Sequence, residues 1–261
     1  MKAEETLLLR RDEEGIAFLT LNRPEARNAL SIALMTALET QIAKIADDPK
    51  VRVVVIGGAG PAFCAGHDLR EIRANPGRQH YETLFAQSSR LMNAITTLAK
   101  PVIASVHGVA TAAGCQLVAT CDLAVASEEA RFATPGVNIG LFCSTPMVAL
   151  SRAIGRKPAM EMLLTGEMIG AAEACRLGLV NRVVAGPMLE ESVRELAGKI
   201  ASKSALTLAI GKAAFYPQAE LPRNDAYALA AEAMVRNMMA FDAEEGIDAF
   251  LAKRAPRWED R

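Results

Sequence analysis

The sequence has few residues of the kinds that bind metals or form disulfides. Its 261 residues include three histidines and five cysteines, and no two cysteines have CxxC spacing. We therefore expect neither a metal site nor a disulfide framework, and the cysteine usage indicates a reducing compartment. The N-terminal stretch MKAEETLLLRRDEEG has acidic residues where a signal peptide would have a long apolar segment, which also predicts a cytoplasmic protein.

The sequence also lacks an excess of one charge. It has 29 Lys and Arg residues against 30 Asp and Glu residues, so the net charge is -1. No strong field would attract nucleic acid or an anionic membrane, and we expect neither as a partner. Residues 108–126 are nearly uncharged and about long enough to cross a bilayer, but they include Asp122 and two glycines. We interpret them as buried core.

Strand and helix patterns alternate as far as about residue 185, which predicts an α/β fold. Residues 6–22 predict a hairpin, residues 51–60 and 101–108 each predict a buried strand, and Ser31 is a candidate N-cap for an amphipathic helix. From about residue 188 only helical patterns occur. We predict a core over residues 1–190 and a helical region over 191–261, whose methionines and alanines suit a subunit interface or ordinary internal packing equally well.

Two predicted strands end in segments of small residues, GGAGPAFCAGHDL and HGVATAAGCQL. Backbone amides without bulky neighbours are free to point at a ligand, and the second segment begins a helix whose N-terminal dipole favours negative charge. Two such amides would make an oxyanion hole. The alternative is that the glycines and alanines only permit close packing of strand and helix.

Six segments then follow one another in an informative order: LNRPEARNAL, FCAGHDL, GVATAAGCQLV with TCDLAVAS, FATPGVNIG, LTGEMIGAAEACRLGLVNRVV and EGIDAFLAKRAPRW. In this order they resemble the enoyl-CoA hydratase/isomerase family, or crotonase superfamily, over essentially the whole chain. The resemblance implies a spiral of ββα units and a C-terminal helical region that builds a homotrimer or a dimer of trimers. It also implies an acyl-CoA thioester substrate in fatty-acid or related metabolism, with coenzyme A as part of the substrate and no separate cofactor.

The resemblance assigns roles to individual residues. The two oxyanion-hole amides fall on His67 and Ala113. The CoA arm would lie along the loop that holds Ala65, His67, Asp68, Leu69 and Arg70. The nucleotide-side positions correspond to Ala26 and Arg27, and Lys253 or Arg254 would reach CoA from the C-terminal region, including that of a neighbouring subunit.

The two glutamates that hydratases of the family use to manage protons are missing. Their positions carry Gln116 and Gly136, neither of which titrates at neutral pH. General acid–base catalysis contributes about 10²–10⁴-fold, so we do not expect efficient enoyl hydration. The His67 ring is the nearest titratable group, and Cys143 is expected to line the acyl pocket or core more often than to act as a nucleophile.

The sequence therefore predicts a lyase or isomerase that stabilises a thioester enolate through an oxyanion hole. One alternative is decarboxylation of a malonyl-type thioester, with the carboxylate oriented by Gln116, Cys143 or Asn138, because departing CO₂ generates the enolate directly. A second alternative is a non-catalytic acyl-CoA-binding protein. A third is a scaffold without a ligand, which would require the His67 and Ala113 amides to be blocked.

Overall fold

The structure is a computed structural model that describes residues 6–261. A six-stranded sheet has the order β1-β2-β3-β5-β7-β10 and is parallel except for its first pair, the β1-β2 hairpin. Its strands are β1 Leu8–Glu13, β2 Ile16–Leu21, β3 Val53–Gly58, β5 Val102–Val106, β7 Leu123–Ser127 and β10 Arg182–Val184. The predicted hairpin and both predicted buried strands are confirmed.

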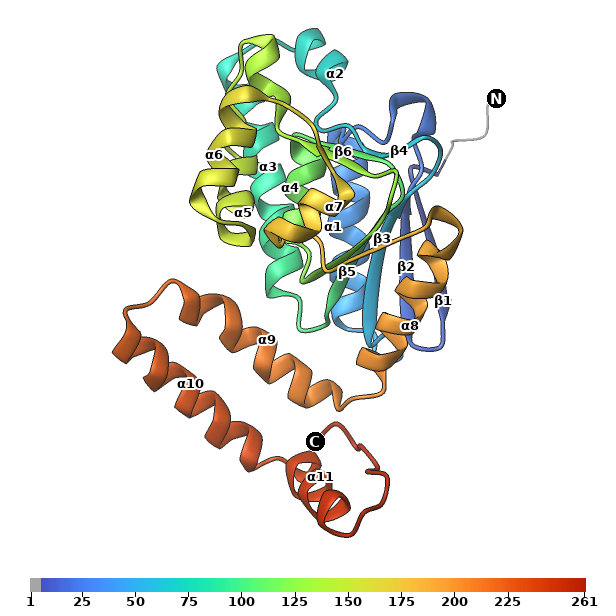
Figure 1. Ribbon diagram of the computed structural model, residues 1–261, viewed down its shortest axis with the longest axis vertical. Coiled ribbons are helices and arrows are strands. Elements are labelled where there is room, and N and C mark those ends of the chain that lie inside the picture. The colour runs from blue at the N-terminus through green and yellow to red at the C-terminus, as the bar shows by residue number, and fades with distance from the viewer. Residues whose placement is uncertain (1–5) are drawn as a thin grey trace.

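A second sheet has the order β4-β6-β8-β9. Its strands are β4 Ala62–Cys64, β6 Val109–Thr111, β8 Arg131–Ala133 and β9 Ile169–Gly170. The chain passes from the first sheet to the second in β3-β4, β5-β6 and β7-β8, and each pair is followed by a helix (Figure 1). This repetition confirms the predicted α/β spiral of ββα units.

The helices surround the two sheets and then continue beyond them. They are α1 Ile32–Ala46, α2 Leu69–Ala74, α3 Arg78–Thr97, α4 Ala113–Thr120, α5 Pro146–Ala153, α6 Arg156–Thr165, α7 Ala171–Leu177, α8 Leu189–Ala201, α9 Ala205–Ala219, α10 Arg223–Met238 and α11 Phe241–Leu251. Short 3-10 turns occur at Pro24–Ala26, Pro135–Ile139 and Gly186–Met188. At the start of α1 the Ser31 hydroxyl accepts a hydrogen bond from the Leu34 N–H at 3.2 Å, which confirms Ser31 as the N-cap.

Two buried apolar clusters lie on the two faces of the six-stranded sheet. The larger one packs α1, α3 and α4 against the sheet and buries most of residues 108–126. The smaller one packs α8 onto the other face, through Leu189, Val193 and Ala197 against Phe18 and Val55. The division predicted at residue 190 therefore falls at the start of a helix that packs on the core sheet.

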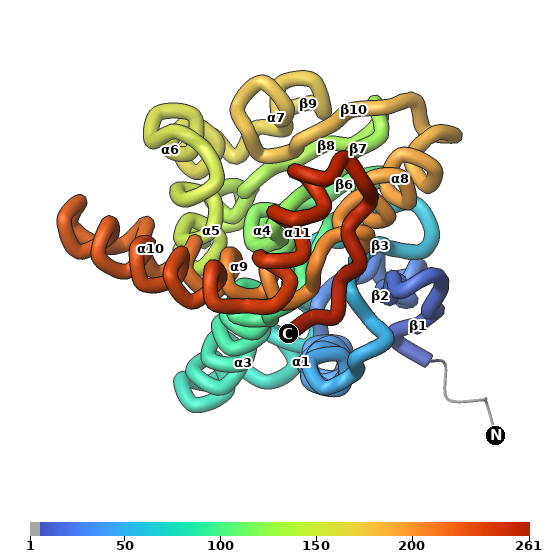
Figure 2. The backbone as a smooth tube through the Cα atoms, turned by 90° about the horizontal axis from the view of Figure 1, so that it is seen from below, coloured from blue at the N-terminus to red at the C-terminus, as the bar shows by residue number. Residues whose placement is uncertain are grey.

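Helices α9, α10 and α11 lie beyond the core (Figure 1). Helices α9 and α10 pack against each other, and α10 extends past the core without burying a single residue (Figure 2). Packing against α9 therefore leaves much of the apolar surface of α10 exposed. In residues 6–261 no helix is both long and apolar enough to cross a membrane.

Candidate functional site

The two segments of small residues lie side by side because β4 and β6 are neighbouring parallel strands. A Cβ added to Gly114 would lie 2.1 Å from the Cys64 carbonyl oxygen, so only glycine lets α4 approach β4 this closely. A Cβ added to Gly66, whose φ is +100°, would lie 2.9 Å from the Ala112 Cβ and 3.4 Å from the Ala113 nitrogen. The small residues thus permit close packing, and the packing brings the two proposed amide positions together.

The backbone just before α4 is strained. Ala112 has φ 50° and ψ -117°, a conformation that residues with a side chain rarely adopt. Its N–H donates to the Ala133 carbonyl at 2.9 Å, and its carbonyl accepts from the Gln116 N–H at 3.0 Å. These bonds hold the Ala112–Ala113 peptide in place at the start of the helix.

The amides of His67 and Ala113 are not used inside the protein. Ala113 is the first residue of α4, where an N–H has no partner within the helix. Neither amide donates to any acceptor within residues 6–261, although Ala113 is fully buried. Two N–H donors on adjacent loops therefore have no acceptor among the described residues.

Three backbone hydrogen bonds join the predicted CoA-arm loop to the segment that contains the nucleotide-side residue Arg27. The Ala65 N–H donates to the Arg27 carbonyl at 3.0 Å. The Leu30 N–H donates to the Gly66 carbonyl at 2.7 Å, and the Asp68 N–H donates to the Leu30 carbonyl at 3.1 Å. The structure therefore brings these two segments together from about forty positions apart in the sequence.

The carboxylate of Asp68 is engaged within the protein. It caps α2 by accepting from the N–H groups of Arg70 and Glu71 at 3.1 and 3.3 Å, and it forms an ion pair with Arg23 at 2.9 Å. Partial burial works against the charged form, but the Arg23 and backbone hydrogen bonds outweigh it and lower the pKa of Asp68. Asp68 therefore shapes the loop, and only its backbone remains for a CoA arm.

Of the other predicted CoA-binding residues, Ala26 and Ala65 are half-buried, and the side chains of Arg27, Leu69 and Arg70 are exposed. Arg27 has a left-handed backbone with φ 50°, and its side chain has no ion-pair or hydrogen-bond partner in the described part of the chain. Leu69 and Arg70 are exposed at the start of α2. These three side chains are accessible to a large ligand.

The structure does not bring the C-terminal basic residues to this site within one chain. Lys253 is exposed and follows the last residue of α11 by two positions. Helix α11 lies at the opposite end of the molecule from α2 (Figure 1). Arg254 forms an ion pair with Glu245, and its two guanidinium nitrogens lie 2.6 and 2.7 Å from the carboxylate oxygens. A contact between Lys253 and this site would therefore require a second subunit.

The two positions of the missing glutamates differ in the space around them. Gln116 is 5% exposed, and its Oε1 atom has no hydrogen-bond partner in residues 6–261. A Cβ added to Gly136 would lie 2.5 Å from the Leu141 carbonyl oxygen and 2.9 Å from the Cys143 Sγ atom. The first position has an unused polar group, whereas the second has no room for a side chain.

The titratable groups near this site are held in neutral forms. Burial raises the pKa of the Cys143 thiol, and burial raises that of Cys115 to about 12. Burial lowers the pKa of His67, against a weaker opposing effect of the Leu30 carbonyl. The His67 ring packs edge-to-face on Phe85 with centroids 5.7 Å apart, and both ring nitrogens are buried without a partner among the described residues. None of these groups is a carboxylate, and burial favours the neutral form of each of them.

Sequence reasoning missed Thr134. This residue is fully buried at the end of β8, and its hydroxyl has no hydrogen-bond partner in the described structure. The signal was a polar residue immediately before the proline of FATPG, at the end of an apolar strand. By contrast Asn138, a candidate for orienting a carboxylate, is exposed.

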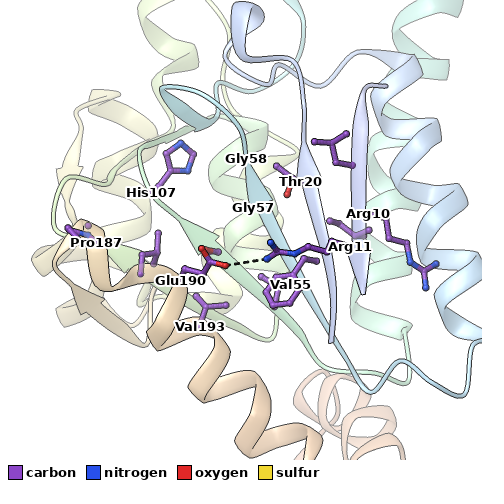
Figure 3. A pocket seen from close by; sticks show the side chains of 16 residues that line it. Arg10, Arg11, Thr20, Val55, Gly57, Gly58, His107, Pro187, Glu190 and Val193 are labelled. Atoms are coloured by element: carbon purple, nitrogen blue, oxygen red, sulfur yellow. Dashed lines mark hydrogen bonds and ion pairs between the residues drawn. The ribbon is translucent and has the colours of Figure 1, made fainter. Parts of the chain in front are cut away.

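A separate cavity of about 550 Å³ opens on the face of the six-stranded sheet that α8 covers. Figure 3 shows Glu190 on α8 facing Arg11 on β1, with their nitrogen and oxygen atoms 3.2 Å apart. His107 lines the same cavity and forms a 2.9 Å hydrogen bond with the Gly60 carbonyl. Neither His67 nor Ala113 lines this cavity. Among residues 6–261 no group of three or more His, Cys, Asp or Glu side chains could hold a metal ion.

Comparison with known proteins identifies the family of this chain. The family model for enoyl-CoA hydratase/isomerase matches residues 11–261. A rat protein named Enoyl-CoA hydratase domain-containing protein 3, mitochondrial, is 48% identical over 98% of this chain and 86% of its own length. A crystal structure titled enoyl-CoA hydratase from Mycobacterium smegmatis has a TM-score of 0.95 and 56% identity, covering 97% of this chain and 99% of that one. The human domain-containing protein 3 structure has a TM-score of 0.94 and 47% identity, covering 97% and 100%. The chain therefore belongs to the enoyl-CoA hydratase/isomerase family.

Proposed function

We propose that this protein binds an acyl-CoA thioester and stabilises its enolate through the backbone N–H groups of His67 and Ala113. The observation that carries the proposal is the pair of unused amides on adjacent loops, one of them following the strained Ala112. As negative charge moves onto the thioester oxygen, two preorganised donors in a dry site stabilise it more than water does. Each such donor lowers the barrier by about 3 kcal/mol.

The CoA moiety would lie across the joined loops that contain Ala26, Arg27, Ala65 and Arg70. Arg27 and Arg70 are the exposed cations on this surface, and either suits a phosphate group. Lys253 would be supplied by a neighbouring subunit of a homotrimer or a dimer of trimers. Support for such an assembly comes from the unburied helix α10 and from the apolar side chains exposed on and around it.

We propose that the reaction is not efficient enoyl hydration, because neither Gln116 nor Gly136 supplies a carboxylate that could activate the attacking water and transfer its protons. The test is hydration of crotonyl-CoA, followed by loss of the enoyl-thioester absorbance, in the natural protein and in Gln116→Glu. We expect turnover far below about 1 s⁻¹ in the natural protein and a measurable gain in the variant. Gly136→Glu is not included, since its side chain would collide with the Leu141 carbonyl.

Two outcomes would contradict the proposal. Turnover of the natural protein at ordinary enzyme rates would mean that another group transfers the proton. Failure of both proteins to bind crotonyl-CoA would contradict the proposed acyl-CoA site. Gln87→Glu is a matched control, because Gln87 is also 5% exposed on a core helix but bonds to Thr36 at 2.9 Å, and we expect no gain from it.

A non-catalytic acyl-CoA-binding protein is the second candidate. The observation that favours it is that the positions of the two hydratase glutamates carry Gln116 and Gly136, neither of which transfers protons at neutral pH. Binding of several thioesters without turnover of any of them would select this candidate. A scaffold without a ligand has less support, because the His67 and Ala113 amides make no hydrogen bond within residues 6–261.

Decarboxylation of a malonyl-type thioester is a more specific reaction, and it has less support than the general proposal that the site stabilises a thioester enolate. Asn138 is exposed, and the Cys143 thiol is neutral, so neither offers a charge to balance a buried carboxylate. The cytoplasmic location stays a prediction from the sequence; the vertebrate relatives are themselves named as mitochondrial proteins.

A further inference from the structure

The cavity on the α8 face of the six-stranded sheet is separate from the site with the two unused amides. Its volume of about 550 Å³ lies within the range of about 300–1,000 Å³ that is typical of small-molecule sites. His67, Ala113, Arg27 and Arg70 all lie outside its lining. Parallel sheets normally have both faces covered, so a gap in the cover of this face has a local cause.

The gap occurs where the side chains on this face of the sheet become small. Residues two apart in a strand share a face. On the face that α8 covers, the same change occurs in three neighbouring strands: Phe18 to Thr20 in β2, Val55 to Gly57 in β3 and Ile103 to Ser105 in β5. Thr20 and Gly57 lie directly opposite each other in the β2-β3 register. Helix α8 packs on the large apolar residues, and the space above the small ones stays open.

The open part of the sheet is formed by the carboxyl ends of parallel strands. Gly57 and Gly58 are the last two residues of β3, and His107 directly follows the last residue of β5. In α/β sheets, ligands bind outside the carboxyl ends of the strands. The cavity therefore lies at the kind of place where such sheets bind small molecules.

Internal packing does not require glycine at position 57. A Cβ added to Gly57 would meet nothing closer than 3.9 Å, whereas a Cβ added to Gly58 would lie 2.6 Å from the Phe63 carbonyl oxygen. A glycine within a strand also marks a site where a ligand can approach the backbone closely. The missing side chain at Gly57 keeps the floor of the cavity open.

Polar groups gather at one end of the cavity. The Thr20 and Ser105 hydroxyls are half-buried and have no hydrogen-bond partner within residues 6–261. The His107 ring uses Nε2 for its 2.9 Å bond to the Gly60 carbonyl. Figure 3 shows Thr20 and His107 at one end and Val55 and Val193 at the other. The cavity therefore has a hydrogen-bonding end and an apolar end.

The arginine and glutamate side chains that line the cavity are already paired. The pairs are Arg11 with Glu13 and Glu190, and Arg10 with Asp12 and Asp48. An ionic ligand would have to displace one of these partners and leave the charge of that partner unpaired, which costs free energy. The lining therefore favours an uncharged ligand.

We propose that this cavity binds an uncharged ring compound that carries several hydroxyl groups, which is the chemistry of a nucleoside. The ring packs against Val55 and Val193, and the flat backbone at Gly57 lets it lie close to the sheet. The hydroxyl groups form hydrogen bonds with Thr20 and Ser105. This site does not depend on the proposed acyl-CoA site, so either can be disproved without the other.

The test is equilibrium dialysis of the full-length protein with uridine, ribose and uridine monophosphate. We expect uridine to bind roughly tenfold more tightly than ribose, because ribose lacks the apolar ring. Uridine monophosphate should bind more weakly than uridine, since its phosphate finds no unpaired cation. An excess of coenzyme A should not displace uridine, because the two ligands occupy separate sites.

Two variants locate the ligand. Gly57→Val fills the floor of the cavity without a clash at Cβ and should lower the affinity for uridine at least roughly tenfold. Gly170→Val is the matched control, because Gly170 is also a strand glycine with nothing within 4 Å of an added Cβ, and it should leave the affinity unchanged. Ser105→Ala removes one hydroxyl and should lower the affinity about fivefold. This second variant keeps the test decisive if Gly57→Val does not fold.

Several results would overturn the inference. Failure of the natural protein to bind uridine, or equal affinity for uridine and ribose, would exclude a site for a hydroxylated ring compound. Affinity that survives in both Gly57→Val and Ser105→Ala would place uridine outside the cavity, as would its displacement by coenzyme A. Tighter binding of uridine monophosphate would exclude a site for uncharged ligands. Failure to bind coenzyme A would contradict only the proposed function.

Discussion

At the scale of single residues, the site depends on which positions can hold a side chain. Gln116 and Gly136 stand at the two positions where hydratases of the family have glutamates, yet the space around the two residues differs. The space at Gly136 is filled by the Leu141 carbonyl and the Cys143 thiol, whereas the amide oxygen of Gln116 has no partner in the described chain. Restoring a hydratase glutamate is therefore feasible at one of these positions only.

Gly136→Ala tests this packing directly. Its Cβ would lie 2.5 Å from the Leu141 carbonyl oxygen, and we expect the free energy of unfolding to fall by about 1–3 kcal/mol in urea denaturation. The matched control is Gly211→Ala in α9, where the added Cβ meets nothing within 4 Å; this change should raise stability by about 0.5–1 kcal/mol. Equal effects of the two substitutions would show that Gly136 is not tightly packed.

At the scale of elements, a partly buried carboxylate connects α9 to the core. Asp122 lies just before β7 and accepts from the Val102 N–H at 2.7 Å. It also accepts from Lys212 and Tyr216 of α9, each at 2.6 Å. Lys212 further donates to the carbonyls of Ile95 and Lys100, each at 3.0 Å. Burial lowers the pKa of Lys212 although Asp122 opposes this shift.

Asp122→Ala should therefore be strongly destabilising, because it leaves the Lys212 ammonium buried without its counter-ion. We expect the free energy of unfolding to fall by about 3–5 kcal/mol in denaturant titrations at fixed protein concentration. The double variant Asp122→Ala/Lys212→Met should recover part of the loss. Glu220→Ala at the end of the same helix breaks only the exposed pair with Arg152 and should have a much smaller effect. If Asp122→Ala lowers the free energy of unfolding by no more than Glu220→Ala does, Asp122 does not anchor α9.

At the scale of the whole molecule, the exposed apolar surface of the C-terminal helices is the dominant feature. Met239 is 83% exposed and Phe250 is 81% exposed, and α10 buries none of its residues. Apolar surface of this extent usually marks a contact with another protein. The proposed homotrimer or dimer of trimers would cover it and would also bring Lys253 to a neighbouring CoA site.

The variant Met239→Asp/Phe250→Asp should prevent this assembly. We expect the mass measured by light scattering after size-exclusion chromatography to fall from that of three or six chains to that of one, because charge in an apolar interface is costly. Leu9→Asp is the control, since Leu9 is an exposed apolar residue on β1 and lies outside the C-terminal helices. A natural protein that is monomeric, or a variant that keeps its full mass, would contradict the proposed assembly.

The sequence by itself determined the elements and the family, because both depend on local patterns and on the order of motifs. The spacing of Leu34, Leu38 and Ile42 predicts α1, the β-branched runs predict β3 and β5, and residue identity alone shows that Gln116 and Gly136 are not acids. These features are encoded within a few neighbouring residues.

Only the tertiary structure decided which groups at the site are free. The strained backbone of Ala112, the orphaned hydroxyl of Thr134 and the lack of space at Gly136 each depend on a segment distant in the sequence or on a specific backbone conformation. The same holds for α10, whose apolar pattern is compatible with either a buried or an exposed face. The physical reason is that space and hydrogen-bond partners are set by how separate segments pack, which local residue patterns do not encode.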